Sequence, residues 1–342
     1  METFLDSTLL TILVIVTVAT VLALVRAQKR DRCMTHFDGY HATLAEKDGR
    51  VTWGELDVRT SGIEIHYPDP RRSQKGFWKQ SFLFYRDQYE AMDGIYRSVS
   101  GLPEDQKEAR HAYLHRTANP GFVRRLYRKI RNWVGMIRDA LVQSVSVLIG
   151  AAKSRAQPAA TVLTRDEERV STLSAEIIGH AGNAFDPLLE KHLFTRVIVD
   201  LTRQGKTYQY CGYLADYTSE FLEIIDAQVN EEAIKFGPEP YRVGDIPVDG
   251  LEIRYDDNEL VVENKSGAMI LLHELRHDGE TLIIGAVIPD GFVAALRPGI
   301  ELDTKQLDIV VSTAHRVDIL VPRSHALVRH GVAGLDLADI AS

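Results

Sequence analysis

The N-terminal stretch constrains this chain most, because residues 8–25 carry no charged side chain. Four basic residues follow at once, namely Arg26, Lys29, Arg30 and Arg32. A helix of that length, at about 1.5 Å per residue, is just long enough to cross a hydrocarbon core of roughly 30 Å. Its threonines can return their hydroxyl hydrogen bonds to the helix backbone. The sequence therefore predicts a transmembrane anchor with a basic flank over residues 1–32.

A cleaved signal peptide is the competing interpretation of this stretch. Such a peptide needs a basic segment before a shorter apolar core, whereas the residues before position 8 include Glu2 and Asp6 and no Lys or Arg. The basic cluster lies on the C-terminal side instead. By the positive-inside rule, the N-terminus lies outside and the bulk of the chain is cytoplasmic. We expect a single-pass protein of a bacterial inner membrane.

Composition agrees with a cytoplasmic body. Only Cys33 and Cys211 occur in 342 residues, which is no disulfide framework. Cys33 lies just past the anchor, where acylation is the alternative to a free thiol. The net charge of -8 argues against a general nucleic-acid binder, which would show a basic domain or stripe.

Residues 33–100 predict a small β module. Three short strands, at 41–47, 51–58 and 63–67, are separated by the turn dipeptides Asp-Gly and Ser-Gly. We expect a meander of closely connected antiparallel strands here.

Residues 161–240 predict helices near 166–178 and 185–192, followed by a related β pattern. Its strands are expected at 197–202, 208–217 and 221–225. Aligning Gly54 with Gly212 also matches Leu56 with Leu214 and Thr60-Ser61 with Thr218-Ser219. The match is a weak internal repeat, and two unrelated meanders are the alternative.

The two copies share one pattern, in which a strand, a turn that ends in Gly and a second strand follow one another. The motif Gly-x-Leu-x(3)-Thr-Ser, followed by an apolar residue, begins inside the second strand. This pattern resembles the small, strongly bent barrels of the Sm-like and PRC-barrel type. A glycine inside a strand suits the sharp bend that such barrels require. The resemblance implies a barrel-like module in each of the two regions.

Residues 101–160 predict a helical region. A charged helix is expected at 103–117, and a longer amphipathic helix at 122–149 is followed by a linker at 151–160. The longer helix sets apolar residues at spacings of three and four against a basic face. Its membrane-surface residues would be Arg124, Arg125, Arg128, Arg131 and Trp133. Binding to anionic lipid headgroups is one interpretation, and a core helix with a solvated basic face is the other.

Residues 241–342 predict a β-sandwich and a tail. Seven short strands are expected at 251–255, 260–263, 268–275, 281–288, 292–296, 308–312 and 317–321. Turn residues separate them at the spacing typical of immunoglobulin-like folds. The turns 264–267 and 288–291 resemble those of bacterial Ig-like or fibronectin-like modules.

The sequence His273-Glu274-Leu275-Arg276-His277 matches H-E-x-x-H, the signature of zinc proteases. That chemistry needs both histidines one turn apart on a helix. Here the flanking pattern predicts a β-hairpin, in which residues four apart lie about 13 Å from each other. We therefore expect no metal site at His273, Glu274 and His277. The helical pair His111 and His115 lacks further ligands and is expected to be a surface pair.

Together these features predict a mainly β multidomain protein with helices. No residue pattern for a catalytic or cofactor site is found, and we expect no enzyme and no cofactor. The expected function is a non-catalytic, membrane-anchored structural subunit of a larger membrane complex, such as a photosynthetic or other energy-converting one. Its partners would be other integral membrane subunits and lipid headgroups. In outline the plan is similar to the H subunit of purple bacterial photosynthetic reaction centres.

Two alternatives stay open at this point. One is a membrane zinc metalloprotease that uses residues 273–277. The other is a homo-oligomeric scaffold that self-assembles on the membrane through its repeated modules.

Overall fold

The computed structural model describes residues 30–118 and 185–332, apart from 74, 204, 229–235, 244, 247, 257–258 and 299–305. The predicted anchor at 8–25 lies outside the described residues, as do the linker and the helix at 166–178. The predicted amphipathic helix, with Arg124, Arg125, Arg128, Arg131 and Trp133, lies outside them as well. None of the helices in the described ranges has the length and apolarity to cross a membrane.

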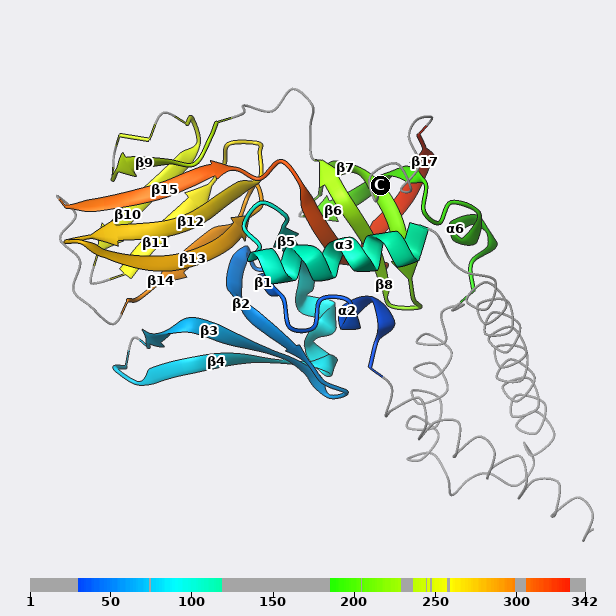
Figure 1. Cartoon of the computed structure of the whole chain (residues 1–342), viewed down its shortest axis with the longest axis horizontal. Coiled ribbons are helices and arrows are strands. Elements are labelled where there is room, and N and C mark those ends of the chain that lie inside the picture. The colour runs from blue at the N-terminus through cyan, green and yellow to red at the C-terminus, as the bar shows by residue number, and fades with distance from the viewer. Residues whose placement is uncertain are drawn as a thin grey trace, which may run out of the picture.

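The described part is mainly β, which confirms the predicted fold class at that level (Figure 1). The helices are α2 (Arg32–Thr35), the 3-10 helix η1 (Arg86–Ala91), α3 (Glu104–Ala118) and α6 (Pro187–Lys191). The strands up to residue 228 are β1 (His41–Glu46), β2 (Arg50–Val58), β3 (Gly62–Arg72), β4 (Trp78–Tyr85), β5 (Met92–Ser98), β6 (Arg196–Arg203), β7 (Lys206–Tyr217) and β8 (Phe221–Gln228). The later strands are β9 (Glu239–Arg242), β10 (Leu251–Asp256), β11 (Glu259–Asn264), β12 (Ile270–His277), β13 (Glu280–Ile288), β14 (Val293–Leu296), β15 (Leu307–Thr313), β16 (Val317–Pro322) and β17 (Ala326–Gly331).

Most predicted elements within the described residues are confirmed. The seven strands expected after residue 250 exist as β10 to β16 with ends within two residues of those predicted. The helices expected at 103–117 and near 185–192 are α3 and α6. Strands β4, β5, β9 and β17 were not predicted, and β3 continues to Arg72. Alternating burial explains the success, since β6 and β11 bury every second side chain along most of their length.

The strands form two sheets. The larger has 13 strands, and the path through it runs β10-β11-β14-β2-β1-β5-β16-β8-β7-β6-β17, with β3 and β4 branching from β2. The smaller has the order β13-β12-β15-β9. It packs against the β10-β11-β14 end of the large sheet through one apolar core, which includes Leu260 and Val262 on one side and Leu272 and Ile309 on the other. This end of the molecule is a two-layer sandwich (Figure 1).

Strand pairing joins regions that the sequence assigned to separate domains. Strand β16 lies between β5 and β8 and pairs antiparallel with both. Strand β17 pairs with β6, and β14 pairs in parallel with β2. The last two strands therefore complete the first and second β modules rather than a separate sandwich over 241–342. Hydrophobic patterning reports the face that a strand buries but not its neighbour, which explains the difference.

Both aligned glycines lie where another strand approaches closely. A Cβ atom on Gly54 of β2 would lie 2.1 Å from the carbonyl oxygen of His66 on β3. One on Gly212 of β7 would lie 2.7 Å from the Ile224 side chain and 2.9 Å from the Ala227 Cα on β8. Each of the two aligned glycines thus lies in a middle strand, β2 or β7, where a side chain has no room.

We expect Gly54→Ala to lower the free energy of unfolding by at least about 3 kcal/mol, because a backbone carbonyl cannot move aside as a side chain can. Gly212→Ala should cost less, since its nearest contact is a side-chain methyl group at 2.7 Å and its backbone contacts are longer, at 2.9 Å. Denaturant unfolding followed by circular dichroism measures both. Gly237→Ala is the matched control, because nothing lies within 4 Å of its Cβ position. Equal stability of Gly54→Ala and Gly237→Ala would contradict the close approach.

The buried carboxylate of Asp318, on β16, joins four elements. Arg97 of β5 donates to it through Nη2 at 2.7 Å, and Arg110 of α3 donates through Nε at 2.7 Å and Nη2 at 2.8 Å. The backbone N–H of Asp226 on β8 donates to the same carboxylate at 3.0 Å. Burial alone would raise the pKa of Asp318, but Arg110 and Arg97 hold it well below its usual range. The carboxylate is fully buried and is satisfied by these donors.

We expect Asp318→Asn to destabilise the protein by about 3–5 kcal/mol, because Arg97 loses its buried ion-pair partner and Arg110 keeps only Asp226, at 3.9 Å. Asp308→Asn is the matched control. Its partner Arg242 is about half exposed, so the loss there should be about 1 kcal/mol or less. Chemical denaturation of the two variants side by side checks the difference, and similar losses would show that Asp318 is not the junction described.

Candidate functional site

The segment directly after the predicted anchor is built into the body. Asp31 caps α2 by accepting a hydrogen bond from the Met34 N–H at 3.2 Å. Three side chains of this segment, Cys33, Met34 and Phe37, are buried among residues of β1 to β5 and Phe221 of β8. The chain is therefore fixed within a few residues of the predicted span, with no linker between Arg30 and the core.

Two residues of the predicted basic flank pair with carboxylates of the body. Arg32 makes a bidentate contact with Asp216 of β7, and its Nη2 also donates to the Tyr217 carbonyl at 2.8 Å. Arg30 lies 3.1 Å from Asp38 and donates to the Val58 carbonyl at 3.0 Å. These contacts hold both basic residues against the body.

A buried polar cluster supports the same segment. His36 Nδ1 lies 2.7 Å from a carboxylate oxygen of Glu223 on β8, and Tyr113 of α3 donates its hydroxyl hydrogen to Glu223 at 3.1 Å. Arg97 donates to the His36 carbonyl at 2.9 Å. Glu223 is fully buried. The cluster ties the α2 segment, which we define as residues 30–37, to α3 and β8. The neighbouring Cys33 thiol is buried, which raises its pKa well above the usual value.

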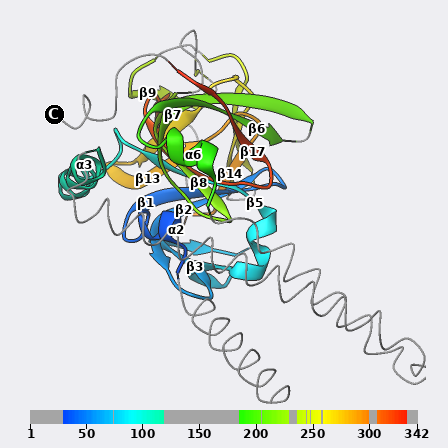
Figure 2. The same cartoon turned by 90° about the vertical axis from the view of Figure 1, so that its right-hand side faces the viewer.

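The β3–β4 hairpin is the second notable feature. Its inner face, with Ile63, Ile65 and Phe84, packs on the core of the first module. Seven large hydrophobic side chains are exposed among the described residues, and four of them lie on this hairpin: Phe77, Trp78, Leu83 and Tyr85. In both Figure 1 and Figure 2 the hairpin lies along the lower side of the body, as does the α2 segment. This concentration on one hairpin distinguishes it from singly exposed apolar residues.

Basic residues surround the aromatic pair at the hairpin tip, which we define as residues 71–79. The tip holds Arg71, Arg72, Lys75 and Lys79 and no Asp or Glu. Arg71 is buried between the rings of Trp53 and Tyr67, 3.9 and 3.8 Å from their centroids, and burial lowers its pKa to about 10. The other three cations are exposed, and within the described ranges none of them has an ion-pair partner.

The sequence motif at 273–277 lies on strand β12, as predicted. His273 lies beside a bulge and its Nε2 is 2.8 Å from the Ser312 hydroxyl, while Glu274 pairs with Arg276 at 2.6 Å. The only described group with metal-ligand spacing is Asp57, Glu64 and His66, at the outer base of the hairpin. Asp57 already accepts from Arg59 Nε at 2.9 Å. The structure does not bring His273, Glu274 and His277 together as ligands.

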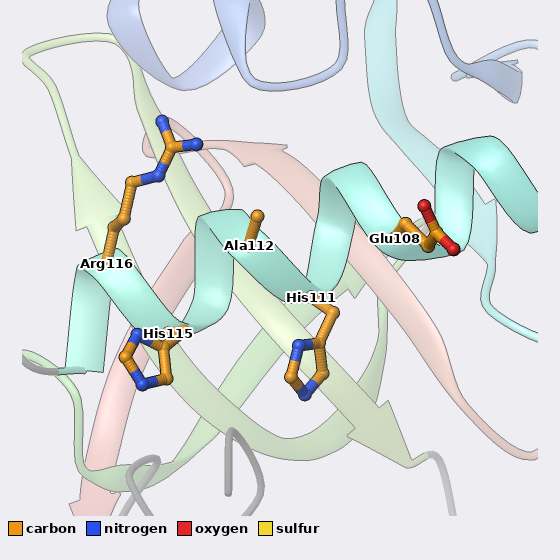
Figure 3. A pocket seen from close by; sticks show the side chains of 5 residues that line it. All are labelled: Glu108, His111, Ala112, His115 and Arg116. Carbon is orange, nitrogen blue, oxygen red and sulfur yellow. The ribbon is translucent and has the colours of Figure 1, made fainter.

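The other histidine pair is a surface pair, as predicted. His111 and His115 are exposed on α3 and project from the same side of the helix (Figure 3). They line an open depression of about 350 Å³ with Glu108, Ala112 and Arg116, all from the same helix. With no described residue from a second element on its lining, the depression offers no convergent polar groups for a substrate.

Sequence reasoning missed the hairpin tip and the role of the α2 segment. The run from Arg71 to Lys79 carried a detectable signal, four cations around a Phe-Trp pair, but no strand pattern placed it on a protruding hairpin. The burial of α2 had no local signal, since its partners Asp216 and Glu223 are about 190 residues away.

We expect part of the stability to depend on the charge of His36. Burial alone would lower the pKa of His36, but the Glu223 carboxylate outweighs it and raises the pKa above the ordinary 6.5. The stabilisation is complete below about pH 6.5 and is lost as pH rises through the pKa of the folded state. His36→Asn should remove this part of the pH dependence, measured as free energy of unfolding between pH 5 and pH 9.

Tyr113→Phe is the control, because it keeps the charged pair and should keep the pH dependence. Differences between variants are needed since burial lowers the pKa of His41, His273 and His325, which contribute with the opposite sign. If His36→Asn left the pH dependence of the free energy of unfolding unchanged, protonation of His36 beside Glu223 would not contribute to stability.

Comparison with models of protein families, with curated proteins and with solved structures finds no match for this chain. The function is therefore argued from the sequence and from the arrangement of the α2 segment and the hairpin alone.

Proposed function

We propose that this protein is a non-catalytic, membrane-anchored assembly subunit on the cytoplasmic face of a bacterial inner membrane. Residues 8–25 supply the span, with the N-terminus outside, and other integral membrane subunits are its partners. The observation that supports this most is the fixed α2 segment. Cys33, Met34 and Phe37 are at most 1% exposed, and Arg32 is bound to β7.

The α2 segment is important because it attaches the start of the described chain firmly to the body. Burying a Met or Phe side chain contributes roughly 1.5–3 kcal/mol each, and the segment adds the ion pairs of Arg30 and Arg32. The body is therefore held at its first described residue, Arg30, which lies five residue steps after Val25. A subunit that positions other proteins needs a fixed orientation, whereas an enzyme on a tether does not.

We also propose a fold type for each β region. We interpret β1-β2-β3 and β6-β7-β8 as a duplicated, bent, barrel-like unit, supported by the required glycines at 54 and 212. We interpret the β9 to β15 region as the Ig-like part, supported by its two facing sheets. Exposed strand edges and faces of such modules commonly bind other proteins.

We expect Val16→Arg to abolish stable membrane insertion, because a charge at mid-span costs roughly 2.5–3.5 kcal/mol on insertion scales. Carbonate washing of membranes measures it: the natural chain and Val16→Leu should stay in the pellet, and Val16→Arg should not. Retention of Val16→Arg to the same extent would count against a spanning helix.

Mass measurement of the intact assembly in mild detergent separates the proposal from its alternatives. We expect foreign subunits in a defined stoichiometry. A homo-oligomer alone would indicate the self-assembling scaffold, and stoichiometric zinc lost on His277→Ala would indicate the metalloprotease. Protease treatment of inverted vesicles tests orientation, and a body that survives would contradict a cytoplasmic location.

A further inference from the structure

We infer that the tip of the β3–β4 hairpin lies in the anionic headgroup layer of the membrane that the anchor crosses, an inference that rests on the proposed function. The residues that would contact the headgroups are Arg72, Lys75, Phe77, Trp78 and Lys79. Phe77 and Trp78 are 70% and 57% exposed, which is a large apolar exposure at the end of an ordered hairpin.

The length of chain between the span and the body limits the position of the membrane. Five residue steps separate Val25 from Arg30, and a fully extended chain covers at most roughly 18 Å in that distance. Arg30 therefore lies close to the end of the span, and the hairpin lies on the same lower part of the body as α2 (Figures 1 and 2). Strand β4 has eight residues, which at about 3.3 Å each span roughly 25 Å. The hairpin is long enough to carry its tip well away from α2 along that side.

The described residues of the tip are held by contacts within the protein. The Arg72 N–H donates to the Arg297 carbonyl at 3.1 Å, and the Ser73 N–H donates to the Phe77 carbonyl at 2.8 Å across the turn. Arg72 stacks on Trp78 with its guanidinium 5.4 Å from the ring centroid. A surface held in place this way loses little conformational entropy on binding.

The positive charge of the hairpin tip favours an anionic lipid surface as its partner. The chain has a net charge of -8, yet its tip carries three exposed cations and no carboxylate. An anionic surface complements the tip, and each basic residue near such a surface strengthens binding about fivefold. Tryptophan beside basic residues is also typical of the membrane interface, where an aromatic ring meets both hydrocarbon and headgroups. A protein partner is the other class of occupant, and the experiment below distinguishes it.

The test uses the full chain with Cys211→Ser, reconstituted into vesicles of anionic or purely zwitterionic lipid. Phe77→Cys carries an environment-sensitive fluorophore, and Leu327→Cys is the control, because Leu327 is 53% exposed on β17, away from the hairpin. Cys33 stays, since its thiol is buried and its raised pKa keeps it unreactive. Quenching by lipid-attached nitroxide reports contact with the headgroup layer, and a carbonate wash of the same vesicles reports insertion.

We expect nitroxide lipids to quench the label at 77 in anionic vesicles and to leave the label at 327 unquenched. Replacing Arg72, Lys75 and Lys79 by Gln should weaken contact of the tip with the surface on the order of 100-fold, and quenching at 77 should then fall to the level at 327. Raising the salt concentration should act in the same direction.

Three results would overturn the inference, and they have different meanings. Equal quenching at 77 and 327 in carbonate-resistant vesicles rejects the headgroup contact and leaves the proposed function intact. Loss of the protein in the carbonate wash rejects the proposed function, and the inference with it. Shielding of the label at 77 only when other membrane subunits are present identifies a protein as the occupant instead of lipid.

Discussion

One buried carboxylate, that of Asp318, is the constraint on which the arrangement of the modules depends. Strand β16 enters between β5 and β8, and Asp318 meets Arg97, Arg110 and the Asp226 N–H there. A buried carboxylate costs several kcal/mol in desolvation unless all its donors are in place. Any register of β16 other than the observed one separates this buried carboxylate from both arginines. The contacts of Asp318 therefore specify one arrangement of the first β module relative to the second. This specificity does not depend on how much they add to the free energy of unfolding.

The α2 segment extends this arrangement toward the predicted anchor. Arg97, which binds Asp318, also donates to the His36 carbonyl, and His36 lies against Glu223 beside Tyr113. The same elements, β5, β8 and α3, thus hold both the inserted strand and the start of the body. Charge on the surface is arranged differently, since three exposed cations of the hairpin tip have no ion-pair partner within the described ranges. Paired charges orient the body, and unpaired ones are available to an external surface.

Local elements of this fold could be predicted from the sequence, and its connections could not. The strands from β10 to β16 follow alternating burial and turn residues, so their ends were predicted closely. The H-E-x-x-H match was placed on a strand because Asp278-Gly279 follows it, and β12 confirms this. Nothing local indicates that β16 pairs with β5, about 220 residues away in sequence, or that Arg32 meets Asp216. The anchor and the basic helix at 122–149 stay predictions.

The central place of β16 has a consequence for synthesis of the chain. Strands β5 and β8 each keep one edge open until β16 arrives, and 88 residues lie between Gln228 and Val317. At about 5–20 residues per second, these edges stay unpaired for roughly 4–18 s after β8 has emerged. Open edges of this kind are templates for aggregation. A chain that ends before residue 317 lacks the strand that joins β5 to β8, so the large sheet is completed only after β16 has been made.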